Sequence, residues 1–371
     1  MATREFHDGA RDGLEALEPL DPDKITSFTD LLEAMGKTAF GGRHLGKAFD
    51  VLWAMIEDPD CHVVMTLSGA MTIAKMGKII TKMIDEGMVQ CIISTGALMA
   101  HGLSESVGKT HYRHDPSMSD EELFRKGYNR VYDTLEMEAN LNYVEHVVTQ
   151  TLKRLDHDRP LSSETLTREL GKTLAEEFGG DGILKSAYLK KVPVFIPAFT
   201  DSEVGLDVGT WAMAREVDRA RSRAGQGGDL AVLRAIHQSC PSFNPYLDLN
   251  SYADHVLSAK RLGIFTIGGG VPRNWAQQVG PYIEIGNLRL GLTVKPPRFH
   301  YGVRICPEPD YWGGLSGCTY QEGLSWGKFV TPNDGGRFAE VLSDATVVWP
   351  LLMMGILERK KAGAVDRVGD R

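Results

Sequence analysis

HVVMTLSGAM (62–71), CIISTGAL (91–98) and IFTIGGGV (264–271) share one pattern: a short apolar run leads directly into small, glycine-rich residues. Apolar runs of this length, without polar alternation, are typical of strands that are buried on both faces. An antiparallel sandwich would expose one face of each strand and alternate polar with apolar residues. The three stretches therefore predict buried parallel strands that end in tight loops.

Segments with helical periodicity separate these strands. The pattern predicts helices within Ala74–Glu86, Asp120–Leu155 and Ser162–Gly179. In the last of these, Leu166, Leu170 and Leu174 share one face, and Ser162 or Ser163 is a candidate N-cap. Strands that alternate with helices indicate an α/β fold, with a parallel sheet covered by helices on both faces. We expect a single large domain.

The ends of the chain differ in composition from its centre. Residues 1–24 are predicted to form a polar lead-in, because Pro19, Pro22 and many carboxylates precede the first apolar periodicity. The single large domain is expected over residues 25–357, and residues 358–371 are expected to form a polar tail. Within the domain, residues 108–122 are predicted to be a polar loop and residues 221–229 an exposed turn.

Composition narrows the class of protein. The 371 residues carry a formal net charge of -8, which disfavours a nucleic-acid-binding surface and suits a small or cationic ligand. Five dispersed cysteines without a CxxC pair indicate free thiols and a reducing compartment. No apolar run approaches the roughly 18 residues of a membrane span. These features predict a cytoplasmic protein without a membrane partner.

The glycine-rich loops are candidates for cofactor binding. Glycine allows the backbone to approach phosphate closely, and loops after parallel strands present unpaired N–H groups. The loops Ser68–Ala70, Ser94–Ala97 and Gly268–Gly270 could therefore hold a dinucleotide together. For each loop alone, the alternative is a tight turn without a ligand. No GxGxxG fingerprint follows the first strand, so the usual dinucleotide signature is missing.

The segment DYWGGLSGCTYQEGLSWGKFV (310–330) concentrates tryptophan, glycine and one lysine. Lys328 lies where burial would lower its pKa, and a neutral amine can attack an imine. The alternative is a solvated surface lysine. His111 and His114 resemble a metal pair, but no third cluster accompanies them, so no metal is expected. HExxH and P-loop motifs are missing, which argues against zincins and P-loop enzymes.

EGLSWGKF (322–329), preceded by WGGLSG (312–317), resembles the catalytic-lysine motif of the deoxyhypusine synthase family in its prokaryotic form. Further stretches that agree with the family occur in order: FGGRHLGKAFDVL (40–52), LSGAM (67–71), STGA (94–97), DEELFRKGYNRVYDT (120–134), PAFTDS (197–202), FTIGGGVP (265–272) and SDATVVWPLL (343–352). The resemblance extends from about residue 25 to residue 352.

The resemblance implies an NAD-binding, Rossmann-like fold and a homotetramer with active sites at a dimer interface. In the family's reaction, NAD removes hydride from spermidine, and the imine is cleaved with release of diaminopropane. The aminobutyl group then passes through a Schiff base on the enzyme's lysine to an acceptor amine, and NADH returns the hydride. The acceptor implied is a lysine of a translation initiation factor.

The resemblance also assigns site residues. It makes Lys328 the nucleophile, with Glu322 and Trp326 along the polyamine channel; Asn274, Gly314 and Asp207 fall at other substrate positions. The positions implied for NAD contact are Ser68, Gly69, Thr72, Thr95, Gly96, Ala97, Asp201, Gly269, Asp344 and Ala345. For Ser68, Thr72 and Asp344 the alternative is a helix N-cap.

Several departures from the eukaryotic pattern fall at the substrate end. Asn274 stands where those enzymes have a histidine, and an amide cannot relay a proton near neutral pH. Leu315 replaces an aspartate, and Ala100 with His101 replaces an acidic pair. Leu206 occupies another aspartate position, with Asp207 directly after it.

Fewer carboxylates predict an altered polyamine channel. Two alternatives follow from this. One is a homospermidine synthase-type enzyme that uses putrescine as the acceptor. The other is a homologue that binds NAD without catalysis.

Overall fold

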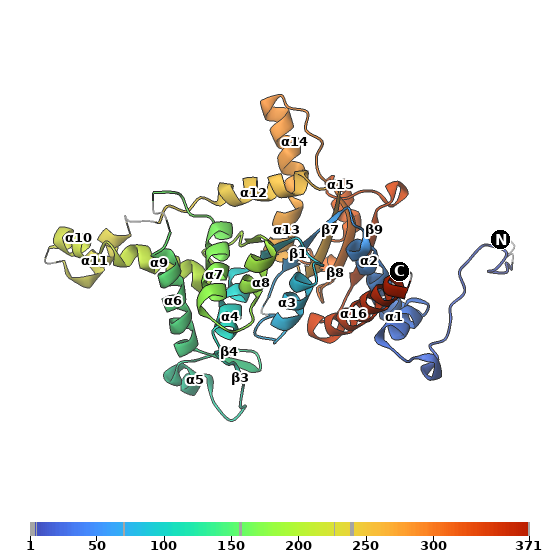
Figure 1. The fold of residues 1–371 in the computed structure, drawn as a ribbon, viewed down its shortest axis with the longest axis horizontal. Coiled ribbons are helices and arrows are strands. Elements are labelled where there is room, and N and C mark those ends of the chain that lie inside the picture. Colours follow the sequence, from blue (N-terminus) through green and yellow to red (C-terminus); the bar gives the residue numbers. More distant parts are fainter. Residues whose placement is uncertain are drawn as a thin grey trace.

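The computed structural model describes residue 4 and residues 6–69, 71–155, 158–225, 227–237 and 241–369, with side chains as far as Gly363. Its centre is a six-stranded parallel sheet (Figure 1). The strands are β1 (Cys61–Leu67), β2 (Cys91–Ser94), β6 (Val194–Phe195), β7 (Arg261–Ile267), β8 (Phe299–Ile305) and β9 (Arg337–Val341). The predicted α/β fold with a parallel sheet is confirmed.

The strands lie in the spatial order β6-β2-β1-β7-β8-β9. Numbered along the chain from one to six, this is the order 3-2-1-4-5-6 that characterises doubly wound sheets. The chain builds outward from β1 in one direction and then from β7 in the other, so the winding reverses between these two strands. Ligands of doubly wound folds bind beyond the carboxyl ends of the strands at such a reversal.

Side chains of alternate strand residues enter two separate cores. Met65 of β1 and Phe265 of β7 belong to the larger core, whereas their neighbours Val64 and Ile264 belong to the smaller one. The larger core is covered by α1 (Phe28–Gly36), α2 (Phe40–Glu57), α3 (Gly77–Asp85), α4 (Gly96–Ser106), α6 (Glu138–Leu152), α7 (Ser163–Glu177), α8 (Ile183–Lys190), α9 (Glu203–Ala214) and α16 (Ala345–Gly369). The smaller core is covered by α12 (Pro245–Leu257), α13 (Gly270–Gln277), α14 (Val279–Leu290) and α15 (Tyr320–Ser325). Helices therefore cover both faces, as predicted.

The helix expected over Ser162–Gly179 is confirmed as α7. The Ser162 hydroxyl accepts a hydrogen bond from the backbone N–H of Thr165, which makes Ser162 the N-cap. Leu166, Leu170 and Leu174 are all buried on one face. This N-cap and this leucine spacing are local signals, so the sequence alone was sufficient to predict the helix.

The segment Asp120–Leu155, predicted from its helical periodicity, contains the helices α5 (Asp120–Lys126) and α6, but a β-hairpin separates them. α5 ends at Gly127, which has a left-handed φ of 68°. β4 (Tyr128–Val131) and β5 (Thr134–Met137) then pair antiparallel, with β3 (Tyr112–Arg113) on the other side of β5. The predicted loop 108–122 therefore contains β3 and the start of α5.

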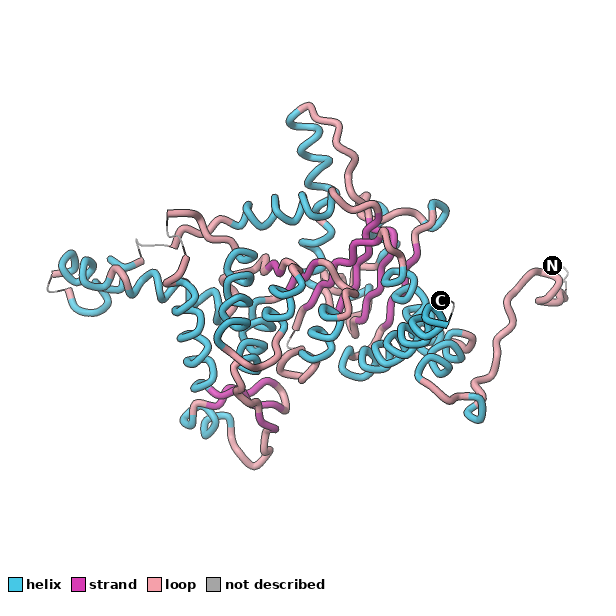
Figure 2. Tube along the Cα trace, in the orientation of Figure 1, coloured by secondary structure: helices cyan, strands magenta, loops and turns pink. Residues whose placement is uncertain are grey.

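Several parts of the chain project from the central body (Figures 1 and 2). α10 (Val217–Ala224) and α11 (Gly228–Ile236) form one projection, so helix occupies most of the expected turn 221–229. α14 forms another, at the top of the view, and the lead-in with its 3-10 helix Pro22–Lys24 extends away on the side opposite α10 and α11. The remaining 3-10 helices are Asp310–Trp312 and Pro332–Asp334.

The carboxyl-terminal helix α16 continues beyond Leu357, where the end of the fold was expected. Lys360 Nζ donates a hydrogen bond of 2.8 Å to Glu86 Oε2. The charged residues after Leu357 therefore contact the domain. Among the described residues no helix combines the length and apolar composition that a membrane span requires.

Candidate active site

Most residues proposed for cofactor contact follow the carboxyl ends of the parallel strands. In the strand register, Leu67 pairs with both Ser94 and Ile267, Ile267 pairs with Ile305, and Ile305 pairs with Val341. These strand ends are therefore level along one edge of the sheet. The proposed residues follow them: Ser68 and Gly69 after β1, Thr95, Gly96 and Ala97 after β2, Asp201 after β6, Gly269 after β7, and Asp344 and Ala345 after β9.

The point where the winding reverses is bridged by a single hydroxyl. Ser68 Oγ accepts a 2.7 Å hydrogen bond from the backbone N–H of Gly269 and donates one of 3.2 Å to the carbonyl of Ile267. Gly268 between them has a φ of +80°, and a Cβ there would lie 2.2 Å from Ser68 Oγ. Glycine is needed at this position for both reasons. Ser68 links β1 to the loop after β7 and is not a helix cap.

Two helices begin at this edge with backbone N–H groups directed into it. Thr95 is the N-cap of α4 and Gly269 is the N-cap of α13, and neither provides a side-chain cap hydrogen bond. Uncapped helix N-termini attract anions such as a pyrophosphate, through free N–H groups and the helix dipole. The edge therefore presents backbone donors of the kind that bind anionic groups.

Two of the alternative N-cap assignments are resolved by hydrogen bonds. Asp344 Oδ1 accepts a 2.7 Å hydrogen bond from the backbone N–H of Thr346, so Asp344 does cap α16. Thr72 is fully buried and its hydroxyl donates 2.8 Å to the carbonyl of Leu98, in the first turn of α4. Thr72 therefore fixes the position of α4 and is not a cap.

Lys328 lies on the smaller-core face of the sheet in an unusual environment for a lysine. Only 7% of the residue is exposed. Its Nζ donates a 3.2 Å hydrogen bond to Oδ1 of Asn274 and lies 5.8 Å from the ring centroid of Trp326. Within the part of the chain that the structure describes, no carboxylate lies within ion-pair distance of Nζ. No ion pair among the described residues therefore balances the positive charge of the Lys328 ammonium.

This environment lowers the pKa of the Lys328 ammonium. The main cause is burial, and the positive charge of Arg273 acts in the same direction, whereas Cys318 and Glu322 oppose the change. Burial disfavours the charged form of an amine because solvation is lost. A larger fraction of neutral amine near physiological pH is the property that an imine-forming lysine needs.

The backbone around Lys328 is fixed by glycine turns and by β8. Gly327 has a φ of +67°, which an L side chain rarely adopts. The Lys328 carbonyl accepts a 3.0 Å hydrogen bond from the N–H of Phe299, at the start of β8. Asn274 lies in α13, five residues after Gly269, which corresponds to about 7.5 Å along a helix axis. α13 therefore runs from the edge formed by the carboxyl ends of the strands to the amine of Lys328.

The other proposed substrate residues differ in where they lie relative to Lys328. Glu322 and Trp326 are exposed beside Lys328, with 63% of Trp326 open to solvent. Gly314 packs so closely against Glu308 that a Cβ would lie 1.6 Å from its Oε1. Asp207 lies elsewhere, on α9, and its electrostatic neighbours are Glu145 and Glu203. A single chain thus brings Asn274, Glu322 and Trp326 to Lys328 but shows no contact between Asp207 and this lysine.

Asp207 is an acidic residue held in a repulsive setting. Burial, together with the charges of Glu145 and Glu203, raises the pKa of its carboxyl to about 7. One carboxylate oxygen of Glu203 is buried without a hydrogen-bond partner in the described chain. A bound cation would relieve this repulsion.

Two residues beside Lys328 were not identified from the sequence. Arg273 is 2% exposed, its Nη1 donates 2.5 Å to the carbonyl of Cys318, and its guanidinium lies 5.2 Å from the ring of Tyr320. Arg273 directly precedes Asn274, and Cys318 lies four residues from both Gly314 and Glu322. Nothing in their identity or spacing shows that they meet, because 45 residues separate them.

The chain thus folds as a single α/β domain, with level strand ends along one edge of its sheet and a buried lysine on one sheet face. A deoxyhypusine synthase family profile matches residues 30–356. A protein of Methanosarcina acetivorans named "Probable deoxyhypusine synthase 2" is 31% identical over 92% of this chain and 89% of its own length. A "Deoxyhypusine synthase-like protein" of Elusimicrobium minutum is 30% identical over 91% of this chain and 82% of its own length.

A solved structure shares the fold. The crystal structure of a putative deoxyhypusine synthase from Entamoeba histolytica superposes with a TM-score of 0.54 at 12% sequence identity, covering 91% of this chain and 96% of that one. The chain belongs to the deoxyhypusine synthase family, whose members are transferases.

Proposed function

We propose that this chain is an NAD-dependent aminobutyl transferase that acts on a polyamine through an imine on Lys328. The observation that carries the proposal is the burial of Lys328 against a neutral amide, with no carboxylate of the described residues within ion-pair distance of its Nζ. A structural or surface lysine would gain from an ion pair, whereas a nucleophilic amine must be able to lose its charge.

The cofactor half of the proposal rests on the edge formed by the strand ends. The strand order supports a Rossmann-like site centred between β1 and β7. Gly69, Gly96 and Gly269 would let the backbone approach the phosphates, and the first turns of α4 and α13 would donate to them. When bound there, NAD supplies a hydride acceptor for the substrate amine and later a hydride donor for the product.

Lys328 carries the covalent part of the reaction. Its neutral Nζ adds to the carbon of the oxidised spermidine imine, forming a C–N bond. The original C–N bond then breaks, and diaminopropane leaves with its electron pair and a proton. The aminobutyl group is now held as an imine on Lys328. An acceptor amine repeats the exchange, which releases Lys328.

Anionic and aromatic groups would bind the polyamine. Glu322 can pair with one ammonium, and the exposed ring of Trp326 contributes a cation–π attraction of roughly 1 kcal/mol. The carboxylates of Asp207, Glu145 and Glu203 form a second anionic region that lacks a compensating cation among the described residues. Asn274 can hydrogen-bond an amine without competing for its proton.

We infer that the site is completed by a second copy of the chain, in a homotetramer. Asp207 and Lys328 are not in contact within one chain, so an interface is needed for both to reach one substrate. The projecting helix α14 and the segment after it expose large apolar side chains, which is typical of surfaces that are covered in an assembly. These are Ile285, Leu288, Leu290, Leu292 and Val294.

The acceptor that we propose is a protein lysine, as in a translation initiation factor. Putrescine is the competing acceptor, because Asn274 and Leu315 replace polar family residues at the substrate end. The two acceptors give distinguishable products, a modified protein lysine or free homospermidine.

The experiment that tests the function is an incubation of the purified chain with NAD and spermidine, with diaminopropane measured by mass spectrometry. Release of diaminopropane that depends on both NAD and Lys328 is the expected result. Addition of putrescine or of a purified initiation factor then identifies the acceptor. Oxidation of spermidine without diaminopropane would indicate a simple dehydrogenase, and NAD binding without turnover would indicate a non-catalytic homologue.

A further inference from the structure

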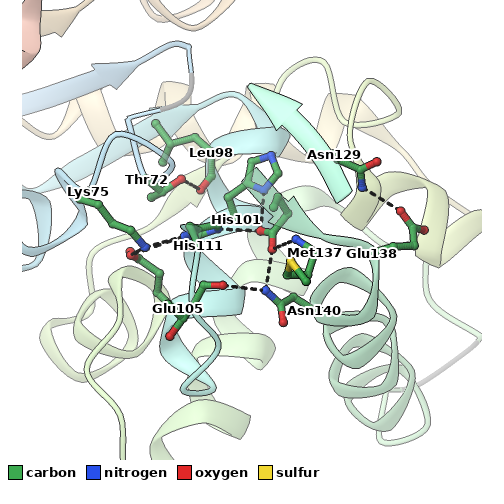
Figure 3. A network of polar contacts seen from close by, with 12 residues as sticks. Thr72, Lys75, Leu98, His101, Glu105, His111, Asn129, Met137, Glu138 and Asn140 are labelled. Carbon is green, nitrogen blue, oxygen red and sulfur yellow. Dashed lines mark hydrogen bonds and ion pairs between the residues drawn. The ribbon is translucent and has the colours of Figure 1, made fainter. Parts of the chain in front are cut away.

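Three side chains that are distant in sequence meet in a buried cluster, and Figure 3 shows its two histidines, His101 and His111. His101 comes from α4, His111 from the segment before β3, and Glu136 from β5. Their exposed fractions are 8%, 6% and 1%. One possible ligand atom from each of the three residues lies within 4.8 Å of the other two. Two imidazoles and one carboxylate are a donor set that binds zinc-like ions in proteins.

The distances within the cluster are compatible with a single ion. Glu136 Oε2 lies 3.1 Å from His101 Nδ1 and 2.6 Å from His111 Nε2. Tetrahedral coordination with bonds of about 2.0–2.1 Å separates the ligand atoms by about 3.3 Å. The first distance already fits, and the second must open by about 0.7 Å as an ion replaces the shared proton.

The surrounding residues orient the carboxylate for one-oxygen coordination. Glu136 Oε1 accepts hydrogen bonds from the Asn140 side-chain amide at 2.8 Å and from the backbone N–H of Met137 at 2.9 Å. Both donors are on the oxygen that does not face the histidines, so Oε2 is the atom directed at them. Outer partners of this kind fix metal ligands in position.

Lys75 occupies the position that an outer partner of His111 would take. Its Nζ lies 2.6 Å from His111 Nδ1 and 2.7 Å from Glu105 Oε1. Glu105 Oε1 itself is 3.8 Å from His111 Nδ1. Lys75 also has a left-handed φ of 64°, an uncommon conformation for a lysine. Its side chain is half exposed, so it can move aside and let Glu105 accept the Nδ1 proton, which gives a carboxylate–histidine–metal arrangement.

We propose that His101, His111 and Glu136 form a binding site for a divalent transition-metal ion such as Zn²⁺. The site connects the small antiparallel sheet of β3, β4 and β5 to α4, the helix whose N-cap is Thr95. The ion would therefore stabilise the edge at which the cofactor loop lies, while its fourth coordination position stays open to water. The proposal is independent of the transferase chemistry at Lys328.

The two histidines that resembled a metal motif in the sequence are His111 and His114, and only one of them belongs to this cluster. His111 takes part, but His114 does not: its backbone N–H donates to the carbonyl of Asp133, and its ring is outside the cluster. The expectation of no metal rested on the lack of a third cluster near His111 and His114. The partners of His111 come from 10 positions earlier and 25 later, which no motif indicates.

The test is titration of chelator-treated full-length protein with Co²⁺, followed by the visible absorption of the bound ion. We expect saturation at one ion per chain, with competition by Zn²⁺. His101→Gln, His111→Gln and Glu136→Gln should each weaken binding by about 100-fold or more. His114→Gln is the matched control and should leave binding unchanged. Substoichiometric binding, or binding that survives the three substitutions, would overturn the proposal.

Lys75→Met gives a second test that does not depend on removing a ligand. Loss of the ammonium beside His111 removes a repulsion from the bound ion and frees Glu105, so Co²⁺ should bind about tenfold more tightly. A cluster held only by hydrogen bonds would bind no ion in either protein. Unchanged or weaker Co²⁺ binding by Lys75→Met would contradict the proposed arrangement. A rise in the unfolding temperature of the wild-type chain with Co²⁺ provides a check that needs no variant.

Discussion

Lys328 and Lys75 are two lysines of one chain in opposite environments. Lys75 is half exposed and its Nζ lies 2.7 Å from the carboxylate of Glu105. Lys328 is buried and its Nζ donates a hydrogen bond to a neutral amide oxygen, at 3.2 Å. An ion pair stabilises the ammonium form, whereas burial without an anion destabilises it. The difference separates a lysine that organises structure from one that can act as a nucleophile.

The largest effect is expected from replacing the nucleophile itself. Lys328→Arg keeps a positive side chain but cannot form an imine, because a guanidinium remains protonated. Release of diaminopropane should fall by roughly 10³-fold or more, with NAD affinity retained. Lys75→Arg is the matched control and should retain transfer. Equal losses in the two variants would remove the distinction between the lysines.

An intermediate effect is expected from placing a carboxylate beside Lys328, as Glu105 is placed beside Lys75. In the wild-type chain the pKa of Lys328 is lowered by burial, so the neutral fraction and the transfer rate rise with pH through a value below 10.5. Asn274→Asp adds a carboxylate, which raises this pKa and moves the rising limb to higher pH. At neutral pH we expect a rate about tenfold lower. The pH profile measures this directly, and an unshifted limb would show that Asn274 does not set the pKa.

A smaller effect is expected on stability. The pKa of Lys328 is lower in the folded chain than in the unfolded one, so the folded chain binds fewer protons. Protonation therefore opposes folding, and this cost disappears as pH rises from the folded pKa to 10.5. Lys328→Met should raise the thermal midpoint by roughly 1–3 °C at neutral pH, and by less at alkaline pH. Calorimetry that finds a lower midpoint would contradict the unfavourable burial.

The smallest effect is the opposite change at Lys75. Without added metal, Lys75→Met removes an ion pair and leaves the buried Nδ1 of His111 without its donor, at a cost of about 1 kcal/mol or less. Thermal unfolding in the presence of a chelator measures this cost. A stabilised Lys75→Met chain would mean that Lys75, like Lys328, is held in an unfavourable environment.

The sequence was sufficient for the features that are local. Apolar runs before glycine identified β1, β2 and β7, and the Ser162 cap with its leucine spacing identified α7. It missed the hairpin where a glycine changed the local direction: Gly127 ends α5, and two strands follow within a segment that was predicted from helical periodicity. The hairpin strands contain Tyr128 and Leu135, which also fit a helical pattern.

The candidate site could be predicted only in part. The motif around Lys328 indicated the nucleophile, but the contact with Asn274 joins residues 54 positions apart. Arg273 and Cys318 lie close to Lys328 because α13 and the segment before α15 pack on the same face. The cluster of His101, His111 and Glu136 likewise depends on how the hairpin packs against α4. These contacts come from tertiary packing, which residue spacing does not encode.

The most direct measurement of the central claim is chemical trapping at Lys328. The chain is incubated with NAD and spermidine, reduced with borohydride, digested and analysed by mass spectrometry. The account predicts an aminobutyl group on Lys328, absent without NAD and absent in Lys328→Arg, with Lys75 unmodified. An adduct on another lysine, or none while diaminopropane is released, would contradict an imine on Lys328.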